Sequence, residues 1–242
     1  MEVTKTIDTE SKKSLATVFQ LTKHTEIFHQ ALYPKALGGG NSFKILAIYG
    51  DNILNITLLD LISKDDSTDT GILTESLHSF HNSTTLIQLA EYLRIDEIMQ
   101  ESWNKPIVPN KDLKEAIEAL LGATYLTSNI KRCKEVVQKL LSISIDNEFL
   151  NPNPIGILNI LFQKKGVKLP KYLSTRVGGP DHQAKFLCTI EGEYDGNKYT
   201  IKSSVTSSKK NAEKDAAKRF LEAIGENERL EYFHLLELNT KL

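Results

Sequence analysis

One group of residues whose types and spacing could do chemistry lies near the C-terminal end: Ser208, Lys209 and Lys210, with Lys214 four residues further on. The serines at 207 and 208 are suited to cap the start of a helix. Free backbone N–H groups and the helix dipole favour phosphate at such a start, and Lys214 can share the face of Lys210. The cluster could therefore bind phosphate, although two lysines at a helix start, taken alone, are more often an ordinary solvated surface.

The hydrophobic pattern predicts that the first part of the chain is helical. From residue 15 to about residue 141, apolar residues recur at spacings of three and four, and no stretch has the alternation of a strand. Polar and glycine-rich stretches separate the expected helices. We therefore expect an all-α domain over residues 15–145, preceded by a flexible leader at residues 1–14.

After the stiff, turn-rich joint Asn151-Pro152-Asn153-Pro154 the pattern changes. The elements predicted there are a helix, two alternating strands joined by a turn at Gly196 and Asn197, and a second helix, at residues 155–165, 185–193, 198–205 and 207–224. This order predicts a small α+β domain over residues 153–224. An amphipathic helical tail is expected at residues 225–242.

The second part also carries a specific order of residues. Gly179-Pro180-Asp181-His182 is followed by Phe186, and later by the run Ser207–Ala217. This order resembles the double-stranded-RNA-binding domain, which implies an α-β-β-β-α fold. Such a domain contacts the 2′-hydroxyls and phosphates of A-form RNA. The RNA-binding residues that the resemblance implies are Gln163, His182, Ser208, Lys209, Lys210 and Lys214. One departure is Glu213, where many members of the family have a third lysine.

Two helical stretches of the first part resemble the ribonuclease III domain. Lys44–Leu54 is similar to the signature helix of that family, usually Glu-Arg-Leu-Glu-Phe-Leu-Gly-Asp. Glu115–Leu126 is similar to its Asp-x-x-Glu-Ala-x-x-Gly-Ala helix. A helical nuclease domain followed by an RNA-binding domain is also the layout of bacterial-type ribonuclease III.

This second resemblance implies metal-assisted hydrolysis of phosphodiester bonds in double-stranded RNA, with Mg²⁺ as the cofactor and Mn²⁺ as a substitute. The acidic positions of the family fall on Asp51, Glu115 and Glu118 as metal ligands, and Asp51 and Glu118 are the implied catalytic residues. The family glutamate four residues before Asp51 is Ala47 here. An alanine can bind neither metal nor water, so the implied site is altered at this position.

Two charged residues lie close to these positions. Lys44 replaces the first glutamate of the family signature and would compete electrostatically with a cation. Asp112 forms another pair three residues apart with Glu115, but the residues after Glu118 identify Glu118 as the one that matches the family. We therefore expect Asp112 at the surface.

Two functions remain open from the sequence. The first is an endoribonuclease that cuts double-stranded RNA as a homodimer through its nuclease domain, with residues around Phe43–Tyr49 as the candidate interface. The second is a catalytically inactive ribonuclease III-like protein that binds double-stranded or ribosomal RNA. Ala47 favours the second function, whereas the retention of Asp51 and Glu118 favours the first. A protein-interaction scaffold built on the tail has little support.

The composition agrees with a globular protein whose charge is arranged locally. The 242 residues carry a formal net charge of −1, so a nucleic-acid partner would have to be met by a local basic cluster. Cys133 and Cys188 are too few for a disulfide scaffold or a cysteine-based metal site, and we expect reduced thiols.

Residues 1–13 lack the features of a secretory signal, and no apolar run approaches the roughly 20 residues of a membrane span. We expect an intracellular protein of the cytoplasm or nucleus without a membrane partner.

Overall fold

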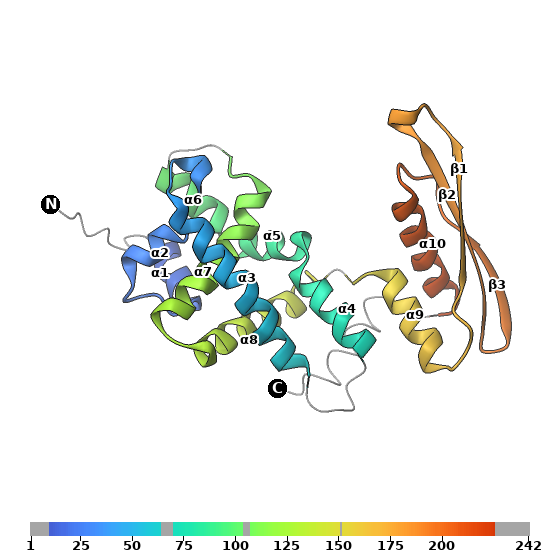
Figure 1. Cartoon of the computed structure of the whole chain (residues 1–242), viewed down its shortest axis with the longest axis horizontal. Helices are drawn as coiled ribbons and strands as arrows, with labels where there is room; N and C mark the ends of the chain where they lie inside the picture. The colour runs from blue at the N-terminus through green and yellow to red at the C-terminus, as the bar shows by residue number, and fades with distance from the viewer. Residues whose placement is uncertain (1–9, 64–69, 104–106, 151, 226–242) are drawn as a thin grey trace. The chain divides into compact units, whose positions relative to one another are not determined.

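The structure is a computed structural model that describes residues 10–63, 70–103, 107–150 and 152–225 (Figure 1). The chain divides into two compact units. The first comprises the residues up to 64 together with 77–151, and the second comprises 65–76 together with the residues from 152 onward. The sequence-based domain bounds, 15–145 and 153–224, stay a prediction. The predicted helical tail lies outside the described residues from residue 226 onward.

The first unit is built from helices, and its described residues contain no strand. The helices are α1 Glu10–Val18, α2 Thr25–Gln30, α3 Asn41–Ile62, the end of α4 Thr70–His81, α5 Ser83–Tyr92, α6 Ile95–Trp103, α7 Asn110–Thr127 and α8 Ile130–Asp146. The predicted all-α class of this part is thus confirmed. Residues 10–14, which we predicted to lie in the flexible leader, are helical instead, because α1 is held by the buried side chains of Leu15 and Ala16.

The centre of this unit is the crossing of α3 and α7. Nearly every residue of α7 from Asp112 to Thr124 is buried, as expected for a helix surrounded by others. At two points the backbones of the two helices meet directly. A Cβ atom at Gly50 would lie 1.6 Å from the carbonyl oxygen of Glu118, and one at Gly122 would lie 2.1 Å from the carbonyl oxygen of Leu46. Only glycine permits an approach this close.

Helix α3 also has the length and composition of a membrane-spanning helix, with a mean hydropathy of 1.5 over its most apolar window. The core helix of a soluble protein passes the same test. Here α3 packs against α7 and α8 and carries Asp51 and Asp60 along its length. The helical core accounts for the buried face of α3, but only 39% of the apolar window is buried and side chains such as Ile48 and Ile56 are exposed.

The second unit has the order α9 Pro154–Lys164, β1 Lys171–Gly178, β2 Lys185–Tyr194, β3 Asn197–Lys202 and α10 Lys209–Ala223. The strands form one antiparallel sheet in the order β1-β2-β3. Both helices lie on the same face of this sheet (Figure 1). The aromatic rings of Phe162, Tyr194, Tyr199 and Phe220 pack between helices and sheet. The predicted α-β-β-β-α fold is confirmed.

The turn between β2 and β3 lies one residue earlier than we predicted. Tyr194 pairs with Asn197, so the two turn residues are Asp195 and Gly196. Their φ angles are 48° and 77°, and a two-residue turn with two positive φ values favours the pair Asp-Gly. Asn197, which we had placed in the turn, begins β3. The predicted free thiols, Cys133 and Cys188, are both buried.

The close crossing of α3 and α7 gives the first testable prediction. Alanine is a better helix former than glycine by about 1 kcal/mol, so propensity alone would make Gly50→Ala stabilising. The added methyl group would instead collide with the backbone of α7. We expect the free energy of unfolding in urea to fall by about 2 kcal/mol or more. Asn52→Ala, at an exposed position of the same helix, is the control and should be neutral or slightly stabilising. A stabilised Gly50→Ala would show that the helices do not meet here.

Candidate functional site

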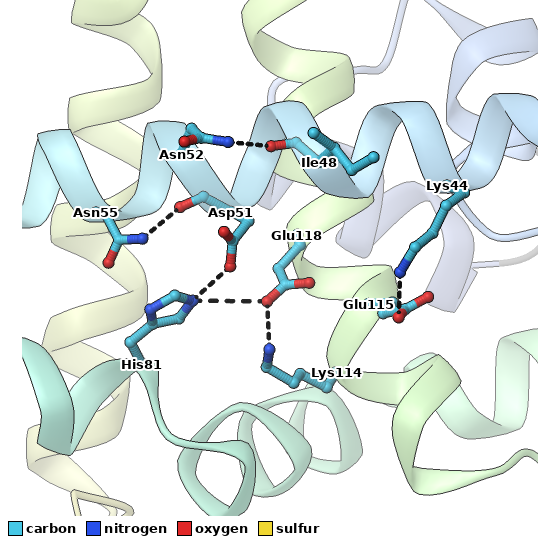
Figure 2. Close-up of polar contacts among 9 residues, drawn as sticks. All are labelled: Lys44, Ile48, Asp51, Asn52, Asn55, His81, Lys114, Glu115 and Glu118. Carbon is cyan, nitrogen blue, oxygen red and sulfur yellow. Dashed lines mark hydrogen bonds and ion pairs between the residues drawn. The ribbon is translucent and has the colours of Figure 1, made fainter.

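Three side chains from three helices converge at the crossing of α3 and α7 (Figure 2). Asp51 follows Gly50 on α3, Glu118 lies on α7 where the backbones touch, and His81 is the last residue of α4. The imidazole Nε2 of His81 lies 2.9 Å from Asp51 Oδ1 and 3.6 Å from Glu118 Oε1. One ligand atom from each residue lies within 4.8 Å of the other two. The structure therefore brings together the two acids that the sequence singled out, with a histidine between them.

The polar atoms at this point are buried without full hydrogen bonding. Glu118 is only 4% exposed. Among the described residues, its Oε1 atom and the Nε2 atom of His81 have no hydrogen-bond partner, although both have polar neighbours within ion-pair distance. The ammonium of Lys114, one turn earlier on α7, lies 2.9 Å from Glu118 Oε1. That contact is an ion pair by distance, but it lacks the geometry of a hydrogen bond.

Glu115 differs from Asp51 and Glu118, because lysine side chains pair with its carboxylate outside the group at the helix crossing. The ammonium of Lys44 donates a hydrogen bond of 2.6 Å to Glu115 Oε1, and Lys111 approaches the same oxygen to 3.9 Å. Glu115 is not part of the group formed by Asp51, His81 and Glu118. The sequence-predicted metal ligand is thus neutralised by a lysine of its own chain, and that lysine stands at the altered first position of the signature helix.

Asp112 lies where we did not expect it. The residue is 9% exposed, so the prediction of a surface position was wrong. Burial raises the pKa of its carboxyl, the negative charge of Glu115 raises it further, and Lys111 and Lys44 oppose this effect. Its place in the first turn of α7 favours a negative charge through the helix dipole, which helps to explain why the residue is tolerated there.

These residues fit one divalent cation better than an all-oxygen centre for two ions. Two carboxylates and one imidazole converge, and two of their atoms are buried with no hydrogen-bond partner. The position that would add an oxygen ligand one turn before Asp51 is Ala47, which is buried. Because Glu115 is occupied by Lys44, Asp51 and Glu118 are the carboxylates left to hold a cation here.

Sequence reasoning missed His81. The residue lies far from both acids along the chain, and no spacing rule links a histidine at the end of one helix to carboxylates on two others. The one signal in the sequence was that His81, a possible metal ligand, directly precedes Asn82. The side chain of Asn82 caps α5 by accepting a hydrogen bond from the Thr85 backbone N–H. A helix end fixed by such a cap holds a neighbouring side chain in place.

The second unit presents the basic cluster at the start of α10. Ser208 is the N-cap residue, and its hydroxyl oxygen accepts a 3.1 Å hydrogen bond from the Asn211 backbone N–H. Lys209, Lys210 and Lys214 are exposed. The departure at Glu213 lies beside this surface: its carboxylate accepts a hydrogen bond from the Ser174 hydroxyl of β1 at 2.8 Å and lies 3.9 Å from the Lys209 ammonium.

The other two predicted RNA-binding residues lie on α9 and in the loop between β1 and β2. Gln163 is exposed in the last turn of α9. His182 is exposed in a short 3-10 turn, Asp181–Gln183. Arg176 fixes this loop by donating to the Asp181 carboxylate at 2.8 Å and to the Gly179 carbonyl at 2.6 Å. All six predicted residues belong to one compact unit, and their RNA-binding roles stay a prediction.

The helical unit thus carries carboxylates at a helix crossing, and the α-β-β-β-α unit with its basic helix start has the fold of a double-stranded-RNA-binding domain. Residues 154–224 match the double-stranded RNA binding motif family. The second unit therefore carries a double-stranded-RNA-binding domain, and the chain is similar to ribonuclease 3 proteins over both units.

The relatives found by sequence agree with this assignment. Ribonuclease 3 of Francisella tularensis subsp. novicida (strain U112) is 29% identical over 194 residues, which are 76% of this chain and 82% of the relative. Ribonuclease 3 of Francisella tularensis subsp. holarctica (strain FTNF002-00 / FTA) is 28% identical over 197 residues, again 76% and 82% of the two chains. Among solved structures, Dicer from Pichia stipitis is matched with a TM-score of 0.38 and 19% identity, over 82% of this chain and 94% of that one.

Proposed function

We propose that this protein is an endoribonuclease that binds double-stranded RNA and cleaves it by metal-assisted phosphodiester hydrolysis, as a step in RNA processing. The observation that carries the proposal is the convergence of Asp51 and Glu118 at the α3–α7 crossing, with a buried carboxylate oxygen left without a hydrogen-bond partner. That oxygen is met by the Lys114 ammonium at 2.9 Å without the geometry of a hydrogen bond, and a divalent cation that replaces this ammonium would carry more charge to it. Similarity to ribonuclease 3 proteins supports the same activity.

In this mechanism the chain itself holds and orients the reacting groups. A divalent cation, Mg²⁺ or Mn²⁺ in this family, supplies an activated water and stabilises the leaving oxygen when it is bound. Asp51 and Glu118 would hold it. Glu118 is buried, so water screens its charge little, and its attraction for a cation is stronger than at an exposed position. Asp51 is half-exposed, which leaves room for a phosphate of the RNA backbone.

A second function is supported by a different observation. The 2.6 Å contact of Lys44 with Glu115 and the alanine at position 47 remove two of the acidic groups on which the family chemistry depends. A chain with such a site could bind double-stranded or ribosomal RNA through its second unit without cutting it. Cleavage of RNA decides between the two functions.

Cleavage of a long RNA duplex in a Mg²⁺ and Mn²⁺ titration, with EDTA as the metal-free reference, tests the nuclease. The amide replacements Asp51→Asn and Glu118→Gln conserve shape but remove the ligand charge, and each should lower the rate by about 100-fold or more. Asp60→Asn is the matched control, because Asp60 is exposed on the same helix and pairs with Lys134 at the surface. It should cleave like the wild type.

Restoring the missing carboxylate sharpens this test. Position 47 lies one helical turn before Asp51, so Ala47→Glu should raise cleavage or lower the metal concentration that cleavage requires. A wild type that binds the duplex but never cuts it would refute the nuclease, and activity gained by Ala47→Glu would then identify a decayed site. Wild-type activity that survives both amide replacements would mean that other residues are catalytic.

RNA binding by the second unit is tested at the start of α10. Replacing Lys209 and Lys210 with alanine should weaken binding to duplex RNA. It should also make the negative slope of log affinity against log salt shallower by about 2, because two phosphate contacts are lost. The charge-matched control is Lys165→Ala with Lys198→Ala, which removes two lysines beside the β2–β3 turn. Filter binding over a range of salt measures both. An unchanged slope in the Lys209 and Lys210 double variant would exclude this mode of binding.

We also propose that the protein is a homodimer through its first unit. Of the interface predicted from the sequence, Phe43, Leu46 and Ala47 are buried in the unit's own core, whereas Ile45 and Ile48 are more than half exposed. These two belong to an exposed apolar stripe along α3 that also contains Tyr49, Ile56 and Leu59. A face this apolar is costly in water and is typical of an interface.

Light scattering at micromolar concentration measures the assembly. The wild type should be a dimer, and Ile48→Lys should dissociate it, because a charge would be buried at the contact. Ile107→Lys is the control, since Ile107 is exposed and lies outside α3. Monomer alone, with and without RNA, would contradict the proposal.

A further inference from the structure

We propose that Asp51, His81 and Glu118 bind one first-row transition-metal ion, such as Mn²⁺ or Zn²⁺, in preference to Mg²⁺. The role of this ion in RNA cleavage rests on the proposed function, but its binding does not and can be measured without RNA. His81 is the residue that sets the preference, and the resemblance to the ribonuclease III family assigns it no role. The three side chains come from α4, α3 and α7 within one compact unit (Figure 2).

The separations of the three ligand atoms suit a shared ion. Two atoms that each lie about 2.1 Å from one ion, at an angle between octahedral and tetrahedral, are roughly 3.0–3.4 Å apart. The Nε2 atom of His81 is 2.9 Å from Asp51 Oδ1 and 3.6 Å from Glu118 Oε1. All three ligand atoms lie within 4.8 Å of one another, so side-chain rotations that close the longer separations would bring them to ligand distance.

The hydrogen bonding points in the same direction. If His81 served only to bind the acids, its Nε2–H group would donate a hydrogen bond to one of them. Neither contact has that geometry, and Nε2 and Glu118 Oε1 are both buried without a hydrogen-bond partner. Buried polar atoms are almost always hydrogen-bonded, whereas among the described residues these two have only contacts of 2.9 Å, with Asp51 and Lys114, that lack hydrogen-bond geometry. A cation between them satisfies both.

The chemistry of the ligands decides which cation fits. Mg²⁺ prefers an octahedral set of oxygen atoms and keeps several waters, whereas imidazole nitrogen suits zinc and other transition metals. The altered positions of this chain remove oxygen ligands, because residue 47 is alanine and Glu115 is held by Lys44. His81 adds a nitrogen in their place. The donor set therefore shifts from carboxylates alone to two oxygens and one nitrogen.

The ammonium of Lys114 competes with a metal ion at this site. Its Nζ atom lies 2.9 Å from Glu118 Oε1, so it neutralises the carboxylate when no ion is bound. A metal ion that takes Glu118 as ligand must displace or repel this ammonium. Removing the charge of Lys114 should then tighten metal binding, which is the opposite of the effect expected for His81. A merely structural cluster would not produce these opposite effects.

The test uses the full chain without RNA, with Mn²⁺ binding followed by electron paramagnetic resonance and with Zn²⁺ and Mg²⁺ as competitors. The wild type should bind one Mn²⁺ at this site, displaced by Zn²⁺ and only at far higher concentration by Mg²⁺. His81→Ala should weaken Mn²⁺ binding by about 10-fold or more, and Lys114→Gln should tighten it. His78→Ala is the matched control, because His78 is exposed on the same helix, and it should bind like the wild type.

A substitution that changes selectivity guards against a simple folding defect. His81→Asp replaces nitrogen with oxygen, so it should narrow the preference for Mn²⁺ over Mg²⁺ while an ion is still bound. Equal binding of Mg²⁺ and Mn²⁺ by the wild type, or Mn²⁺ binding that His81→Ala and His81→Asp leave unchanged, would overturn the proposal.

The two proposals fail separately. Mn²⁺ bound through His81 by a protein that cuts no RNA would refute the nuclease and keep the metal site. RNA cleavage in Mg²⁺ that is undiminished in His81→Ala, with Mn²⁺ bound no more tightly than Mg²⁺, would refute the metal site and keep the nuclease.

Discussion

The direct contact of the α3 and α7 backbones is the constraint on which the first unit depends. Gly50 and Gly122 leave no side chain between the helices, and the two elements lie as close as their main chains allow. Asp51 directly follows Gly50, and Glu118 lies one turn before Gly122. The packing that forms the core therefore also sets the separation of the two carboxylates. Because packed interiors resist small displacements, the site inherits the rigidity of the core.

Carboxylates gathered at such a crossing repel one another, and the chain meets this repulsion with its own lysines. Lys44 neutralises Glu115 and Lys114 lies beside Glu118, while Asp51 is in contact with His81. The raised pKa of Asp112, caused by burial and then by Glu115, shows how costly the acids are in this region. Internal pairing offsets part of the repulsion among the acids, but each paired acid is then less available to bind a metal ion.

In the second unit, one side of α10 packs against the sheet and another side carries the exposed lysines. Ala212, Ala216, Ala217 and Phe220 bury one side of α10 against the sheet, while Lys209, Lys210 and Lys214 stay exposed. Glu213 lies between these sides, and its hydrogen bond from Ser174 ties it to β1. The carboxylate of Glu213 also lies 3.9 Å from the Lys209 ammonium, so it offsets part of the positive charge at the start of the helix, while Lys210 and Lys214 stay exposed.

The sequence by itself determined the helical character of the first part and, in the second, a helix, two strands and a helix, since apolar spacing and turn residues act locally. The third strand of the α-β-β-β-α order came from the resemblance to the double-stranded-RNA-binding domain. The sequence also pointed to Asp51 and Glu118, through the order of residues around each. No residue range for β1 followed from the sequence, because most residues of that strand are exposed and the alternation of apolar and polar residues along it is weak. Only the tertiary structure decided that Glu115 pairs with Lys44, that Asp112 is buried and that His81 joins the two acids. Those contacts join helices distant along the chain, and the distance between such helices is set by packing at glycines, which no local pattern records.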